Sequence, residues 1–187
     1  MRGVGLAAAV LAAVLAGTAK AAAAPSDQPT IRGCITAAAK VYRLPPAVLV
    51  ILLNVEGGSL GRVSPNTNGT VDIGPIQVNQ IWLPDVAAHW HATIADAYKA
   101  LRDNFCANVE AGAWILRRGL DEARGDFWEG VGYYHSHTPE HKTRYLRDVL
   151  RQVVHLRTLV EHAVTSAPPN VVQVTAPPLA PERRPSD

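Results

Sequence analysis

The fold of this chain is decided by the stretch PAVLVILLNVEGG, which runs from Pro46 to Gly58. A proline costs nothing at the start of a helix, where its missing N–H would have no partner, and the run from Ala47 to Val55 is almost wholly apolar. Two glycines then stop the helix, because glycine tolerates the left-handed conformation of a C-terminal cap. We therefore expect a buried central helix over 47–55, with Glu56 in its last turn.

Most of the surrounding segments also show the three- and four-residue apolar spacing of helices. The exception is 59–71, which lacks this period and contains Asn68-Gly69, the strongest short signal for a β-hairpin. The sequence therefore predicts an α+β fold, mainly α, with a small hairpin region. The other expected helices cover residues 32–43, 79–89, 94–118 as one or two helices around Asn104, 126–134, and a last helix capped by Thr138 that runs from Pro139 to Val160.

The N-terminus has the pattern of a signal peptide. Met1 and Arg2 precede an uncharged run whose apolar centre, Val4 to Ala16, has 13 residues, fewer than the roughly 20 that a membrane span needs. Small residues follow, so we expect residues 1–24 to be removed and the protein to be periplasmic or secreted, with no stable membrane span. An uncleaved membrane anchor is the alternative.

The C-terminus is expected to be a disordered tail. Residues 166–187 contain six prolines and no aromatic residue, a composition that cannot build a packed core. The paired prolines could bind a partner or act as a spacer, but a solvated tail is the simpler interpretation. The folded domain is therefore expected to span residues 31–163.

The charge balance argues against a nucleic-acid-binding protein, and the cysteine content indicates a disulfide. Lys and Arg total 18 against 16 Asp and Glu, and loss of Arg2 and Lys20 with the leader would leave 16 of each. A near-neutral protein is a poor nucleic-acid binder, because phosphate binding needs an excess of Lys and Arg on one face. In an exported chain the two cysteines, Cys34 and Cys106, are most simply a disulfide, with two buried free thiols as the alternative.

Glu56 is the strongest candidate for chemistry. The dipole at a helix C-terminus opposes negative charge by roughly 0.3–1 kcal/mol, and burial opposes it further. Both effects should raise its pKa and keep it protonated, as a general acid requires. The alternative is a surface glutamate at a frayed helix end.

Four stretches in order carry a family resemblance: VEGG at 55–58, NTNGTVDIGPIQVN at 66–79, GAWIL at 112–116 and GYYHS at 132–136. Together they resemble the lytic transglycosylases of the lysozyme-like superfamily, and most closely the small members that accompany secretion, conjugation and pilus systems. Four ordered motifs are specific where one alone would be weak. The resemblance covers about residues 34–149 and implies a lysozyme-like fold with a substrate cleft beside the hairpin.

The resemblance implies an enzyme that cleaves peptidoglycan glycan strands without cofactor or metal. Glu56 would protonate the oxygen between N-acetylmuramic acid and N-acetylglucosamine, then take a proton from the muramoyl 6-hydroxyl to leave a 1,6-anhydromuramoyl end. Gln77 and Asn79 match the residues that line the glycan cleft, and Tyr134 matches the tyrosine that faces the catalytic carboxyl. The expected partners are the glycan strand and an envelope-spanning secretion, conjugation or pilus machine.

The chain departs from the family pattern at three positions. Gly57 replaces the usual serine after the glutamate, His135 replaces the usual asparagine after the tyrosine, and Ile76 replaces a methionine. Gly57 and His135 favour an alternative, a peptidoglycan-binding or assembly module without turnover. The seven histidines lack zinc-type spacing, so we expect no metal site.

Asp72 bears on a third possibility, a lysozyme-type hydrolase. Hydrolysis by paired carboxylates needs a second acid roughly 5 to 9.5 Å from the first, and Asp72 is the only other acid in the motif block. We interpret Asp72 as an acceptor that braces the loop after the hairpin. If it reached the cleft, a hydrolase would become the better enzyme assignment.

Overall fold

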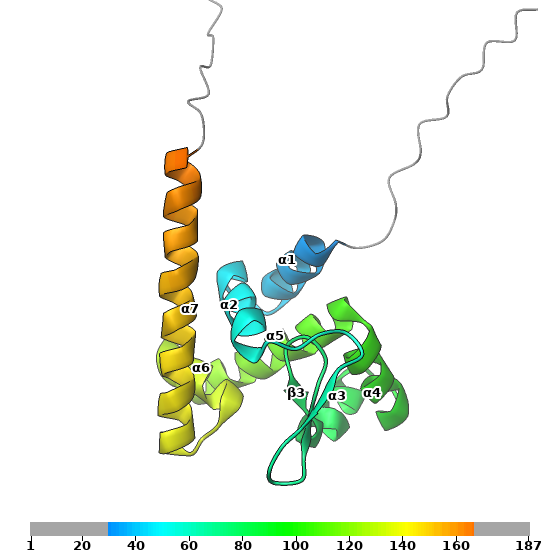
Figure 1. The fold of residues 1–187 in the computed structure, drawn as a ribbon. Helices are drawn as coiled ribbons and strands as arrows, with labels where there is room; N and C mark the ends of the chain where they lie inside the picture. Colours follow the sequence, from blue (N-terminus) through cyan, green and yellow to red (C-terminus); the bar gives the residue numbers. More distant parts are fainter. Residues whose placement is uncertain (1–29, 167–187) are drawn as a thin grey trace, which may run out of the picture.

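A computed structural model describes residues 30–166 and shows a mainly helical α+β protein (Figure 1). The predicted leader, and the predicted tail apart from Ser166, lie outside the described residues. The helices are α1 (Ile31–Val41), α2 (Pro46–Glu56), the 3-10 helix η1 (Gln80–Trp82), α3 (Leu83–His89), α4 (Ile94–Asp103), α5 (Phe105–Glu122), α6 (Phe127–His135) and α7 (Pro139–Ser166). The strands are β1 (Val63–Pro65), β2 (Val71–Ile73) and β3 (Val78–Asn79).

The strands form one antiparallel sheet in the order β1-β2-β3. The predicted hairpin at Asn68-Gly69 is confirmed: the Asn66 N–H donates to the Thr70 carbonyl at 2.8 Å across the turn. The third strand was not predicted, because it has only two residues and the second of them, Asn79, was expected to begin a helix. Its register places Asn79 opposite Asp72.

The central helix is α5, so the prediction that residues 47–55 form it is wrong. Nine residues of α5 are buried, against three of α2. Figure 1 shows α5 passing through the middle of the helices, with α1 and α2 on one side and α6 beside it. The physical reason is the small size of the side chains in the middle of α5. The run Ala111-Gly112-Ala113 lets neighbouring segments approach this helix closely, whereas α2 has one end beside the sheet.

Local capping signals mark several helix ends as predicted. Gly57 ends α2 in the left-handed conformation, with φ 58°. Asn104 separates α4 from α5, and its side chain accepts a hydrogen bond from the Ala107 N–H at 3.1 Å. The last helix runs further than expected, because α7 continues through Ser166, which the composition assigned to the tail.

Within residues 30–166 no single helix is long and apolar enough to cross a membrane; α1 and α2 pass that test only as a pair, and they are bent by 119°.

A disulfide joins Cys34 in α1 to Cys106 in α5, as the cysteine count predicted. The two cysteines are 72 residues apart and their Cα atoms lie 4.9 Å from each other. A bond that closes so long a loop restricts the unfolded chain strongly. It therefore ties the first helix to the central one.

Removing this bond should lower the free energy of unfolding by about 4 kcal/mol. Urea denaturation of Cys34→Ala against the oxidised wild type measures the loss. Cys106→Ala and the double variant are matched controls, and both should lose the same amount because only one bond is removed. Unchanged stability, with a thiol at Cys106 that reacts freely in the native wild type, would contradict the disulfide.

Candidate active site

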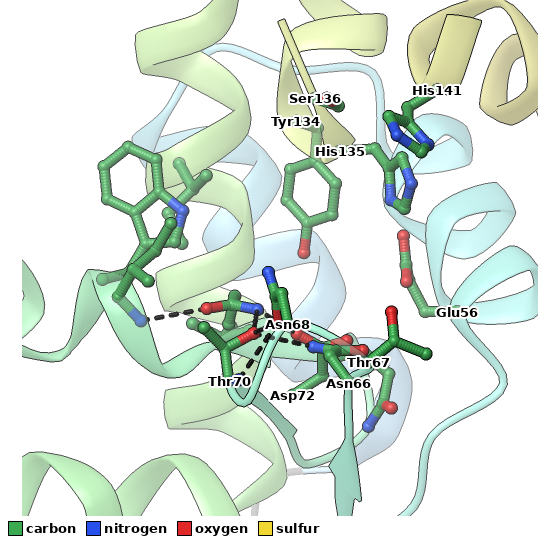
Figure 2. A pocket seen from close by; sticks show the side chains of 16 residues that line it. Glu56, Asn66, Thr67, Asn68, Thr70, Asp72, Tyr134, His135, Ser136 and His141 are labelled. Carbon is green, nitrogen blue, oxygen red and sulfur yellow. Dashed lines mark hydrogen bonds between the residues drawn. The ribbon is translucent and has the colours of Figure 1, made fainter. Parts of the chain in front are cut away.

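A cavity of about 480 Å³ lies between the end of α2, the hairpin, α6 and the start of α7. Figure 2 shows Glu56 and His135 on one side of it, the hairpin residues from Asn66 to Asp72 on another, and the Tyr134 hydroxyl pointing in between. The cavity brings together the four residues that the resemblance placed at the site, Glu56, Gln77, Asn79 and Tyr134. Together with Ile115 of the 112–116 stretch, all four of the quoted motifs thus supply side chains to one cavity.

Glycines let the motif segments touch. A Cβ on Gly58 would lie 2.1 Å from the Gly74 carbonyl oxygen, and one on Gly112 would lie 2.6 Å from Ile76 Cγ2. Neither separation is sterically allowed, so both positions need a residue without a side chain. The segment 74–77 is therefore held between the end of α2 and the middle of α5, which fixes the floor of the cavity.

The Glu56 carboxyl is largely withdrawn from water. Burial, with a smaller contribution from the charge of Asp72, raises its pKa to about 7, while a hydrogen bond from Tyr145 opposes the rise. The Tyr145 hydroxyl donates to Glu56 Oε1 at 2.7 Å. The expected raised pKa is thus present, and near neutral pH a large share of this carboxyl carries its proton.

The tyrosine that contacts the carboxyl is Tyr145, which sequence analysis did not single out. Tyr134 lines the cavity, but its hydroxyl donates to the Ile76 carbonyl at 2.8 Å. Burial raises the pKa of Tyr134 well above its ordinary value, and the charges of Glu56 and Asp72 add to this. A signal for Tyr145 was available, because it precedes the buried Val149 by one helical turn and so lies on the face of α7 that packs on the domain.

Asn79 and Gln77 reach the cavity but use their amide N–H groups within the protein. Asn79 Nδ2 donates to Asp72 Oδ1 at 2.7 Å and to Thr70 Oγ1 at 3.0 Å. Gln77 Nε2 donates to the Gly74 carbonyl at 2.7 Å. Asn79 therefore stiffens the hairpin and orients Asp72, and Gln77 stiffens the segment 74–77.

Asp72 does more than the sequence indicated. It accepts the hydrogen bond from Asn79, as expected of a bracing acceptor, but it also lines the cavity and its charge raises the pKa of Glu56. The expectation that it stays out of the cleft is therefore wrong. Its position on β2 explains this, because successive residues of a strand face opposite sides: Ile73 is fully buried, and Asp72 faces the cavity.

His135 occupies the position where the resemblance expected asparagine. Its ring lies parallel to that of Tyr145, with centroids 4.6 Å apart and planes 4° from parallel. Burial lowers the pKa of His135, the charge of Asp72 opposes this, and nearby His141 lowers it further. The side chain is therefore a neutral polar group at pH 7, as an asparagine would be.

The described residues 30–166 contain no group of three or more His, Cys, Asp or Glu side chains placed to hold a metal ion.

No protein-family model and no curated protein matches the chain.

The raised pKa of Glu56 also makes stability depend on pH. Below its ordinary value of 4.5 the carboxyl is protonated in both the folded and the unfolded chain, so its contribution is fully present. As pH rises through about 7, the folded protein must ionise a withdrawn carboxyl, and this stability is lost.

Glu56→Gln has no proton to lose, so it should gain stability relative to the wild type as the pH rises. We expect the difference between their free energies of unfolding to change by about 3 kcal/mol between pH 4.5 and pH 8.5. Urea unfolding at both pH values measures it, and Glu161→Gln, which changes an exposed carboxyl on α7, is the matched control. A difference between wild type and Glu56→Gln that stays constant with pH would contradict the raised pKa.

Proposed function

We propose that this chain is a peptidoglycan lytic transglycosylase, which cleaves the β-1,4 bond between N-acetylmuramic acid and N-acetylglucosamine without water. The observation that supports this most is the Glu56 carboxyl, withdrawn from water and with a pKa of about 7, in a cavity lined largely by polar side chains. Such a group can give a proton and later take one at the same pH.

The reaction would use Glu56 twice. Its proton passes to the oxygen that leaves with N-acetylglucosamine as the C1–O bond of the muramoyl residue breaks. The carboxylate then takes the proton of the muramoyl 6-hydroxyl as that oxygen bonds to C1, which closes the 1,6-anhydro ring and restores the acid. The Tyr145 hydroxyl, hydrogen-bonded to Glu56 Oε1, stabilises the carboxylate between the two steps, and the charge of Asp72 would stabilise an oxocarbenium-like transition state.

Asp72 supports a second candidate, a lysozyme-type hydrolase. A second carboxylate that faces the cavity and is oriented by a hydrogen bond could act as nucleophile or as base toward water. This makes the hydrolase a stronger candidate than the sequence alone indicated. The transglycosylase remains our first proposal because the four-motif resemblance assigns both proton transfers to Glu56, and Glu56 has the pKa that both transfers need.

The proposal extends to where the enzyme works. A leader at residues 1–24 would export it to the periplasm or beyond, where peptidoglycan lies. Local cleavage of the wall would then make room for an envelope-spanning secretion, conjugation or pilus machine. The resemblance to members that accompany such machines supports this part.

Digestion of purified sacculi tests the function directly. We expect soluble fragments with 1,6-anhydromuramoyl ends, identified by mass spectrometry and by their resistance to borohydride reduction. Reducible muramic acid ends would instead assign the hydrolase. Protein that binds sacculi and releases nothing would assign a binding or assembly module.

Asp72→Asn separates the two enzymes further. The variant keeps an oxygen that can accept the hydrogen bond from Asn79, so the wall of the cavity should stay in place. A hydrolase that needs the second carboxylate would lose its activity, whereas a transglycosylase would keep its anhydro product and lose only part of its rate.

A further inference from the structure

A smaller cavity of about 280 Å³, here called the side pocket, adjoins the Glu56 cavity. It lies between Trp82, Arg118, Tyr133 and His137, and it shares Trp82 and Ile115 with the larger cavity. The two cavities therefore lie next to each other, with Trp82 and Ile115 lining both. The proposed reaction uses no residue that belongs to the side pocket alone.

Arg118 is held in the side pocket by aromatic rings. Its guanidinium carbon lies 5.2 Å from the ring centre of Trp82 and 4.9 Å from that of Trp114. Arg118 Nη1 lies 3.7 Å from Asp85 Oδ2, which is too long for a hydrogen bond. The side chain is half exposed, at 50%, so its N–H donors remain accessible to a ligand.

The acids of the side pocket are already paired. Asp121 Oδ1 lies 2.7 Å from Arg117 Nη2, and Glu122 Oε1 lies 3.0 Å from His137 Nε2. Among the described residues that line the side pocket, Arg118 is thus the charged group whose N–H donors remain available to bind a ligand. A planar fork of N–H donors fits the two oxygens of a carboxylate.

We propose that the side pocket binds a free carboxylate of the peptide stem that branches from the glycan strand. This rests on the proposed function, because it needs a strand in the Glu56 cavity. The stem hangs from the lactyl group of muramic acid, so it would leave the strand as a side branch, and the side pocket lies beside the main cavity, with Trp82 lining both. In an intact wall the lactyl carboxyl forms the amide bond to the stem peptide and carries no charge. The carboxylates of the peptide itself are therefore the ligands.

Arg118→Gln tests this on three materials: sacculi with intact stems, glycan strands stripped of stems by an amidase, and chitin oligomers, which carry no carboxylate. We expect binding to stem-bearing sacculi to weaken about tenfold, the loss typical of one charge-assisted hydrogen bond, with a matching rise in KM. Binding to the other two should not change. Arg118→Lys keeps the charge without the fork and should recover only part of the loss, and Arg151→Gln, which removes an exposed charge from α7, should lose nothing.

The outcomes separate this proposal from the function it rests on. An equal loss on all three materials would mean that Arg118 only supports the tryptophans, and a loss confined to stripped strands would assign the lactyl carboxylate; either result overturns the stem proposal. If the wild type binds sacculi but releases no product, the proposed reaction fails while the binding comparison still decides the side pocket. If the wild type binds none of the materials, both proposals fall.

Discussion

Replacing Glu56 with glutamine should lower the rate of glycan cleavage by roughly 10²- to 10⁴-fold. Glutamine has nearly the same shape, and its side-chain oxygen can still accept the hydrogen bond from Tyr145. The fold of the cavity should therefore survive, and what is lost is the transferable proton. The release of soluble fragments from sacculi, followed over time, measures the effect.

The same reaction should depend on pH in a defined direction. Cleavage begins with the protonated acid, so kcat/KM should fall as the pH rises through about 7, the pKa of Glu56. Glu161→Gln, which changes an exposed carboxyl on α7, is the control and should match the wild type in both rate and profile. A near-normal rate in Glu56→Gln, or a wild-type profile that stays flat through pH 7, would remove Glu56 from the mechanism.

Helix ends and the hairpin could be predicted because short local signals produce them. Gly57 caps α2 and Asn104 caps α5 through contacts within a few residues, and Asn68-Gly69 forms a turn that closes on itself. The identity of the central helix could not be predicted in this way. It depends on how closely other segments approach, and α2 has the more hydrophobic sequence although α5 has more buried residues.

The same distinction between local signals and long-range contacts applies to the residues of the candidate site. Glu56 could be found because it follows an apolar run and so was expected to be buried, and burial is the main cause of its raised pKa. Tyr145, which donates to Glu56, comes from 89 residues further along the chain, and no local pattern links the two. Asp72 was misjudged for a related reason: its bond to Asn79 follows from the local register of two strands, whereas its exposure to the cavity depends on how the whole sheet is placed.

Asn108 is a second residue that local patterns do not reveal. It lies in the first turn of α5 and is fully buried, with 0% exposure. Its Oδ1 accepts from the Ile76 N–H at 2.7 Å, and its Nδ2 donates to the carbonyls of Ile73 at 2.9 Å and Leu101 at 3.0 Å. One side chain thus satisfies three backbone groups from β2, the segment 74–77 and α4, directly beneath the cavity.

We expect Asn108→Leu to lower the free energy of unfolding by about 5 kcal/mol, because each buried backbone group left without a partner costs about 1–3 kcal/mol. Asn104→Ala is the matched control: it removes an asparagine from the same helix but loses only an exposed cap, which costs about 1 kcal/mol. Urea denaturation of both variants measures the difference. Equal stability of the two would show that the segment 74–77 is held by its packing against Gly58 and Gly112 alone. A large gap would mean that the wall of the cavity depends on a single amide, since a domain of ordinary stability has only about 5–15 kcal/mol in total.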